Sequence, residues 1–485
     1  MTPTATEAAL KKIGDKVLPT LCLLTGLLAC IVLGALTSLA GSTVSGREPL
    51  IVLILLATWP FIYLATKKFG WLTFIAFSLF GVVQIEPAPF DLLFVAMILI
   101  GLLSGRILVE RLQKSAILNC IMWLFLTITL ISFVFSAEIM HSLRYTFITF
   151  YCISITYFLK LYIHSMARMK PIMIGYLVGA LISVGFVILN YFGLTPPDTF
   201  VEQSRARGLF KDSNVFGPFL ILPILLLAEE MWRPALLKKW PLGVRILCLF
   251  VLSAGVFLSF SRAAWGNLLI TLLLYVMLNL KRFEAKHIRS TLWLSAVGVA
   301  TLLIVVVIFD LADFLHYRAN VIQSYDDDRF GAQWSGIQLG LSNFVGIGPG
   351  MMDRNGLFAP HSLYIRTFAE HGILGFLSLL GLLVTLIAPV IRLHIQTDEK
   401  RVGLSPSMMI AVATGLYLNS FLIDTIHWRH FWFVLGLLWV MHPPYTLVQK
   451  SSTSRLKTQR VFQPNSAAEP DKTYLGELYP NVLSK

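Results

Sequence analysis

The side chains of this 485-residue chain that are best suited to chemistry are a few arginines in polar segments. Arg205 and Arg207 lie close together, Arg262 follows Ser261 between two apolar stretches, and Arg329 lies in a longer polar segment. A guanidinium binds phosphate oxygens as a fork, so these four arginines indicate anion recognition, most simply of a diphosphate. The alternative is that their side chains contact lipid headgroups or extend to a membrane surface.

One histidine is well placed for proton transfer. His361 follows a proline at the entrance of an apolar stretch, and the ordinary pKa of an imidazole suits proton transfer near neutrality. A neutral His361 can take the proton of a sugar hydroxyl while nearby arginines hold a diphosphate leaving group. His371 is a weaker candidate, and His427 and His430 are expected at a membrane interface.

Two groups of polar residues lie near the arginines in the sequence. Asp212 or Asn214 is predicted to cap the helix that follows, and a helix amino terminus with Arg207 nearby favours a phosphate. The simpler interpretation is that both residues only cap the helix. The run from Asp326 to Asp328 favours a solvated turn or an ion pair with Arg329 over a metal site. We therefore expect neither a metal nor another cofactor.

The elements that position these residues follow from composition. Hydrophobic residues make up 56% of the chain and charged residues only 13%, against about 45–50% and about 25% in soluble domains, which excludes a water-soluble enzyme. About 20 apolar residues span a bilayer as a helix, and fourteen candidate spans recur between residues 18 and 446. The sequence predicts an all-α polytopic bundle of about 12 to 14 transmembrane helices over residues 1–447. The polar segment 448–485 is expected to be a disordered cytoplasmic tail.

Orientation follows from the basic residues. Most of the 39 Lys and Arg residues fall in alternate connecting segments, which are expected to be cytoplasmic. Both termini are then inside, and residues 194–213 and 311–370 are the two long outer segments. The net charge of +13 is interpreted as a record of topology and not as a nucleic-acid surface.

The order of these motifs resembles that of a known family, the O-antigen ligase and Wzy polymerase superfamily. The most specific element is His361-Ser362, followed after nine residues by Gly372-x-x-Gly375. The other elements, in chain order, are the segment from Arg207 to Asn214 with Gly208, Phe210 and Asp212, the pair Ser261-Arg262, and Arg329 in the large outer segment.

The resemblance implies a bundle related to the GT-C glycosyltransferases in a bacterial inner membrane. Such enzymes transfer a glycan from an undecaprenyl diphosphate carrier to a sugar hydroxyl on the periplasmic face, without nucleotide or metal. The resemblance assigns His361 as the base or as the residue that positions the acceptor. The arginines that would stabilise the diphosphate are Arg207 or Arg205, Arg262 and Arg329, and the supporting residues are Asp212, Asn214, Ser362, Gly372 and Gly375.

Several functions stay open. A ligase would use lipid A core as the acceptor and is slightly favoured by the histidine and glycine spacing, whereas a polymerase would extend another lipid-linked glycan. A flippase or secondary transporter would carry charged residues near mid-bilayer and helices broken by Gly or Pro. A metal-dependent glycosyltransferase would lose activity with a chelator.

Overall fold

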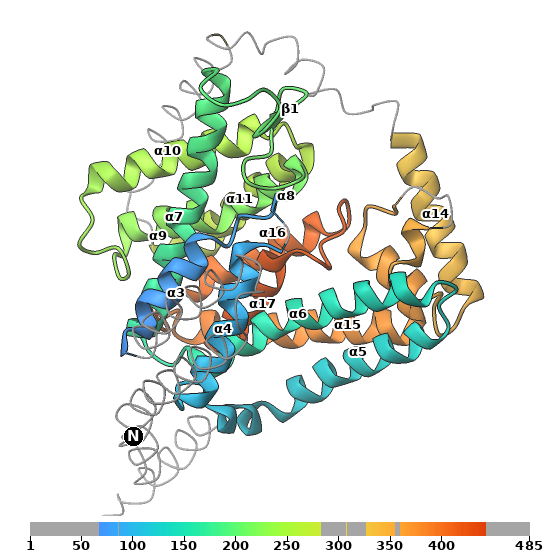
Figure 1. Cartoon of the computed structure of the whole chain (residues 1–485). Coiled ribbons are helices and arrows are strands. Elements are labelled where there is room, and N and C mark those ends of the chain that lie inside the picture. Colours follow the sequence, from blue (N-terminus) through green and yellow to red (C-terminus); the bar gives the residue numbers. More distant parts are fainter. Residues whose placement is uncertain (1–66, 86, 283–306, 308–325, 355–358, 443–485) are drawn as a thin grey trace, which may run out of the picture. The chain divides into compact units, whose positions relative to one another are not determined.

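The computed structural model describes residues 67–85, 87–282, 307, 326–354 and 359–442. Most of these residues are helical (Figure 1). Within these ranges, the helices long and apolar enough to cross a membrane are Ala116–Val134, Met166–Tyr191, Ser213–Trp232, Arg262–Arg282 and Leu363–Gln396. The predicted all-α membrane class is thus confirmed. The predicted spans 18–40 and 49–66, most of 291–310, and the tail 448–485 lie outside the described residues.

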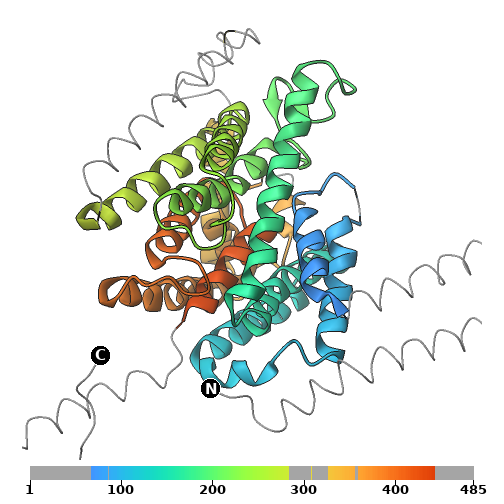
Figure 2. The same cartoon turned by 90° about the vertical axis from the view of Figure 1, so that its left-hand side faces the viewer.

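The amino-terminal half of the described chain supplies five helices. They are α3 (Phe69–Ser78), α4 (Pro89–Leu103), α5 (Ala116–Val134), α6 (Ile139–Tyr162) and α7 (Met166–Tyr191), with the short 3-10 helix η1 (Val109–Ser115) before α5. Helix α3 packs along α7, as Figure 2 shows in blue and green. Pro89 occupies the first turn of α4, where its missing N–H costs no helical hydrogen bond.

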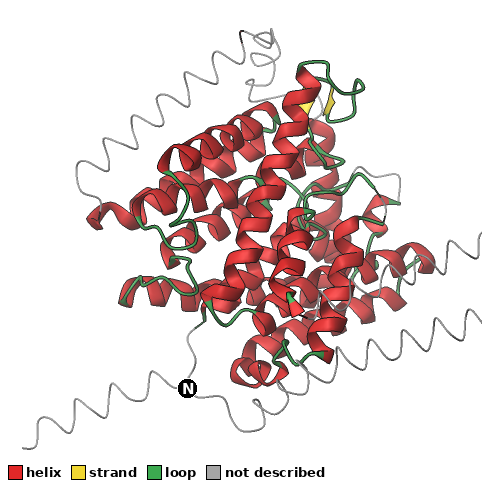
Figure 3. Cartoon of the chain, turned by 60° about the vertical axis from the view of Figure 1, so that its left-hand side comes forward, coloured by secondary structure: helices red, strands yellow, loops and turns green. Residues whose placement is uncertain are grey.

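The carboxy-terminal half adds helices and one small hairpin. The helices are α8 (Ser213–Phe219), α9 (Ile221–Trp232), α10 (Leu242–Leu258), α11 (Arg262–Asn279), α14 (Asp326–Ser342), α15 (Leu363–Gln396), α16 (Pro406–Asn419) and α17 (Arg429–Met441), with the 3-10 helices η2 (Leu280–Arg282) and η3 (Met351–Asp353). The hairpin pairs β1 (Val201–Glu202) antiparallel to β2 (Arg205–Ala206), with Val201 opposite Ala206 (Figure 3). It directly precedes α8.

Aromatic side chains from four helical regions form part of the core. Tyr176 of α7 stacks on Phe433 of α17, with ring centroids 5.2 Å apart. Phe80, which follows α3, packs against both rings, and Phe90 of α4 packs against Phe80. All four rings are buried. This cluster joins α3, α4 and α7 to α17.

Part of the large outer segment predicted at 311–370 is a helix. Asp326 begins α14, which packs along α15, so the aspartate run is the first turn of a helix where a solvated turn was predicted. Asp327 and Asp328 are exposed. Acidic side chains in the first turn of a helix interact favourably with its dipole, which explains their position without a bound cation.

Helix α15 is interrupted at Gly372. This residue has φ 66° and ψ −171°, whereas its neighbours are helical. The N–H groups of Ile347 and Gly348 donate to the carbonyls of Ala369 and Glu370, each at 3.0 Å. A Cβ on Gly372 would collide with the carbonyl of Phe344. The turn around residues 344–348 therefore docks onto the interruption, and the first predicted glycine permits this close approach.

Gly372→Ala is expected to destabilise the protein by more than about 1 kcal/mol, because the new Cβ meets backbone and the left-handed φ disfavours alanine. Thermal unfolding of the purified protein in nanodiscs measures the effect. Gly381→Ala is the matched control in the same helix, since a Cβ there meets only Ile121 at 3.9 Å. The control is expected to be neutral or slightly stabilising. Equal unfolding temperatures for both variants would contradict the structural role of Gly372.

Candidate functional site

Two of the predicted segments meet at the side chain of Asn214. Its Oδ1 accepts hydrogen bonds from Arg205 Nη2 at 3.0 Å and from Ser261 Oγ at 2.8 Å. Arg205 Nε also donates to the carbonyl of Ser259 at 3.4 Å. Arg262 directly follows Ser261 as the first residue of α11. The fold thus brings together residues more than forty positions apart in the sequence.

Arg207 is held differently from Arg205. Its Nη1 pairs with Glu202 at 2.7 Å, and its Nη2 and Nε donate to the carbonyls of Asp198 and Thr199. Its guanidinium is thereby bound to the hairpin and to the residues that precede it. Arg205 thus contacts Asn214 of α8 and Ser259 before α11, whereas Arg207 is bound to its own hairpin and to the residues that precede it.

Three helices of this region, α8, α11 and α15, each begin with a polar side chain that caps the helix. Asp212 Oδ1 accepts the N–H of Asn214 at 2.8 Å, which confirms the predicted cap of α8 for Asp212. Ser261 caps α11 through the N–H of Ala264, and Ser362 caps α15 through that of Ile365. A polar side chain here satisfies backbone N–H groups that have no helical partner. Asn214, the other residue predicted as a possible cap, instead links Arg205 to Ser261 through its side-chain oxygen.

His361 lies exposed just before α15, in a left-handed conformation with φ 44°. Desolvation lowers the pKa of its imidazole, and the nearby charge of Arg329 lowers it further, while Asp212 and Asp424 raise it. Arg329 itself donates to the carbonyl of Leu422. The charges of Asp212 and of Arg329 thus both act on the imidazole of His361. The lowered pKa keeps the imidazole neutral at pH 7, as a base requires.

One turn beyond Ser362, Arg366 forms a cluster that sequence reasoning did not foresee. The side chain is 3% exposed and contacts three carboxylates, those of Asp353 at 2.6 Å, Glu370 at 3.1 Å and Asp424 at 2.7 Å. Tyr145 donates to Asp353 at 2.6 Å. Burial raises the pKa of Asp353, but the hydrogen bond and charge of Arg366 outweigh it, and the net pKa is lowered.

Glu370 also fixes the glycine-rich turn that docks on α15. Its carboxylate accepts the N–H groups of Gly350 at 2.8 Å and Met352 at 3.2 Å. The four-residue spacing of Arg366 and Glu370 is a signal that the sequence carries, because such residues share one face of a helix. No pattern near Asp353 or Asp424 in the sequence indicates that these residues pair with Arg366. We infer that the cluster holds the start of α15, and so His361, in place.

The other candidate histidines pack against neighbouring side chains. His430 is 4% exposed and packs edge-on against Phe219, so its side chain faces other helices, and its position at a membrane interface stays a prediction. His427 bonds Thr149 Oγ1 at 3.1 Å, and His371 is 1% exposed beside Phe125. All three imidazoles are thus packed against side chains of the bundle.

Comparison with known proteins adds no assignment. A scan against protein-family models finds no matching family, and a search of curated proteins finds no match. Within the described ranges, no group of three or more His, Cys, Asp or Glu side chains is arranged to hold a metal ion. The role of each site residue thus stays a prediction, to be judged from geometry.

Proposed function

We propose that this protein is a membrane glycosyltransferase that transfers a glycan from a polyprenyl diphosphate carrier to a sugar hydroxyl. The observation that carries the proposal is the convergence of Arg205, Asn214 and Ser261, with Asp212 near His361 and Arg329. A cationic side chain that can bind a diphosphate, that of Arg329, thus acts on an imidazole whose pKa is lowered, and this supports the proposal. This combination suits a reaction that needs a base and an anionic leaving group.

The proposed step is a direct displacement. The neutral imidazole of His361 takes the proton of the acceptor hydroxyl, whose oxygen forms a bond to the anomeric carbon of the donor. The bond from that carbon to the diphosphate oxygen breaks, and its electron pair stays on the diphosphate. Arg205, Arg262 and Arg329 stabilise the charge that develops there. In-line attack inverts the configuration at the anomeric carbon.

The finer assignments belong to this proposal. The motif order supports an O-antigen ligase with lipid A core as acceptor, and a polymerase that extends a lipid-linked glycan would use the same groups. We expect a GT-C-like bundle in a bacterial inner membrane, with cytoplasmic termini and a periplasmic site. We also expect transfer to persist in the presence of a metal chelator.

The two neighbouring arginines provide a sharp test. Arg205→Gln is expected to lower the rate of glycan transfer by about 10²–10³-fold, the effect of removing one donor to a developing oxyanion. Arg207→Gln is the matched control and is expected to change the rate far less, because its guanidinium is bound within its own loop. Both rates are measured in membranes after thermal unfolding shows that the variants are folded. Equal losses, or a larger loss in Arg207→Gln, would overturn the assignment.

The pH dependence tests the role of His361. Because the pKa of His361 is lowered, the base stays neutral and transfer stays at its full rate below the ordinary histidine pKa as the pH falls. Arg329→Gln removes a positive charge that lowers this pKa, so the acid limb of the rate profile is expected to shift to higher pH. A shift to lower pH, or none, would show that His361 is not the titrating base. The midpoint of the limb is the readout, whatever the absolute rate.

A further inference from the structure

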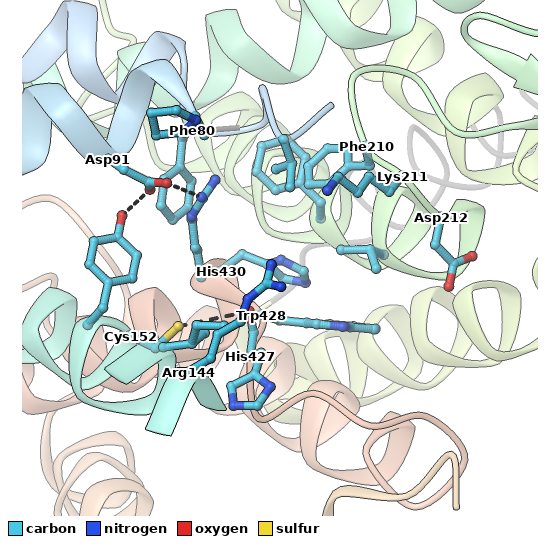
Figure 4. Close-up of a pocket in the computed structure, with 18 residues that line it drawn as sticks. Phe80, Asp91, Arg144, Cys152, Phe210, Lys211, Asp212, His427, Trp428 and His430 are labelled. Atoms are coloured by element: carbon cyan, nitrogen blue, oxygen red, sulfur yellow. Dashed lines mark hydrogen bonds and ion pairs between the residues drawn. The ribbon is translucent and has the colours of Figure 1, made fainter. Parts of the chain in front are cut away.

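A cavity of about 540 Å³ lies beside the predicted site, among the starts of α4, α8 and α17 and the middle of α6. Figure 4 shows Asp91 at one side, Lys211 and Asp212 at the other, and His430 and Trp428 between them. Its volume lies within the range of about 300–1,000 Å³ typical of ligand pockets. The proposed displacement does not use its residues apart from the charge of Asp212.

Asp91 holds one side of the cavity through two hydrogen bonds. It accepts from Arg429 Nη2 at 2.7 Å and from the hydroxyl of Tyr151. The other terminal nitrogen of Arg429, Nη1, is buried and has no hydrogen-bond partner among the described residues. A buried guanidinium N–H normally has an acceptor, whereas the rings of Phe90 and Tyr151, each with its centroid 5.9 Å from the guanidinium carbon, offer only a cation–π contact, so Nη1 keeps an unused donor.

His430 provides a second, independent indication. It is 4% exposed, it lines the cavity, and its Nε2 makes no hydrogen bond to any part of the chain that the structure describes. Its ring lies 4.9 Å from that of Trp428, at an interplanar angle of 30°. An aromatic face thus adjoins an unsatisfied polar atom. Such buried polar atoms are completed by water or by a ligand.

The charges of the lining select the kind of ligand. Asp91 and Asp212 oppose an anionic group, while Arg144, Lys211 and Arg429 oppose a cation. An apolar chain would leave Arg429 Nη1 and His430 Nε2 without a hydrogen-bond partner. Burial lowers the pKa of His427 to about 4, so its imidazole adds no charge near neutrality. A neutral sugar fits this lining, because its hydroxyls both donate and accept and its C–H face can pack on Trp428.

We infer that this cavity binds a neutral sugar residue of the acceptor glycan. The assignment of this sugar to the acceptor rests on the proposed function, whereas the binding of a sugar in the cavity does not. Asp212 lines the cavity on the side opposite Asp91, and its charge raises the pKa of the His361 imidazole. A glycan that fills the cavity from Asp91 to Asp212 would therefore extend toward the proposed base.

The test uses two cavity variants of the full chain in nanodiscs. Asp91→Asn removes the charge that pairs with Arg429, and Ile148→Trp fills the cavity without removing a polar contact. Phe147→Trp is the matched control, because this neighbouring side chain is 65% exposed and does not line the cavity. The probes are core oligosaccharide from lipopolysaccharide and glycan from the lipid-linked pool, both released by mild acid.

Saturation-transfer NMR and transfer kinetics give separate readouts. At least one probe is expected to bind the wild type and the control, and both cavity variants are expected to weaken binding and raise the acceptor KM by about tenfold or more, with little change in kcat. The inference would be overturned if both variants kept the wild-type binding and acceptor KM, or if only the donor KM changed. It would also be overturned if neither probe bound the wild type. Probe binding that the cavity variants weaken, without any transfer by the wild type, would leave the cavity as a sugar site and reject the proposed function.

Discussion

Replacing His361 is expected to lower the rate of glycan transfer by about 10²–10⁴-fold, the usual contribution of a general base. The residue is exposed and lies just before α15, so its loss removes little packing. Its left-handed backbone, with φ 44°, favours asparagine over alanine as the replacement, because asparagine tolerates this conformation. His361→Asn therefore removes the base with little change in stability, and initial rates in membranes measure the effect.

His371→Asn is the control for loss of a histidine near the same helix. His371 is buried beside Phe125 and is assigned no contact with substrate, so its replacement is expected to affect stability more than the transfer rate of the folded protein. If His361→Asn retained the wild-type rate while folded, the imidazole would not be the base. The division of roles between His361 and the arginines would then be wrong.

Replacing Arg366 by methionine is expected to lower the free energy of unfolding by about 3–5 kcal/mol, the cost of removing one partner from a buried ion pair. Asp353, Glu370 and Asp424 would lose their shared cation, and Glu370 would be left 2% exposed. Methionine keeps most of the length of the side chain, so the loss reports on charge more than on packing. Chemical denaturation in detergent or nanodiscs measures this change.

Arg354→Met is the control for loss of an arginine in the same region. Arg354 pairs with Glu138 at 3.3 Å, and both side chains are about half exposed, so the expected loss is below about 1 kcal/mol. Similar stability for the two variants would show that the cluster around Arg366 is not a structural anchor.

The sequence predicted the parts of the fold that depend on local pattern. The apolar stretches that became α5, α7, α11 and α15 are visible because a bilayer core demands about 20 apolar residues in each helix. The cap at Asp212 was also visible, because a helix start favours particular residue types. Gly372 was singled out only by the resemblance, and its left-handed φ comes from the structure. These signals act within a few residues of the chain.

The features that the sequence did not predict depend on distant contacts. Asp91 pairs with Arg429 across more than three hundred residues, and nothing near either residue indicates the other. The same holds for Asp353 and Asp424 around Arg366. Helix α14 was missed because its apolar residues are too few to resemble a span, although an acidic first turn is typical of a helix start.

The choice between Arg205 and Arg207 illustrates how geometry extends the sequence. Both arginines precede the same helix, so spacing could not separate them. The guanidinium of Arg207 binds Glu202 and the carbonyls of residues 198 and 199. The guanidinium of Arg205 donates a hydrogen bond to Asn214. The difference depends on the β1–β2 hairpin, whose strands of two residues each are too short to leave a strand pattern.

The central claim is tested most directly by a transfer reaction with the purified full-length protein in liposomes. The liposomes contain a polyprenyl-diphosphate-linked glycan and lipid A core, and the products are separated and identified by mass. The account predicts a new glycosidic bond and release of the polyprenyl diphosphate in the presence of chelator, with lipid A as acceptor for a ligase or longer lipid-linked chains for a polymerase. An intact donor that only crosses the bilayer, or no reaction with either acceptor, would contradict it.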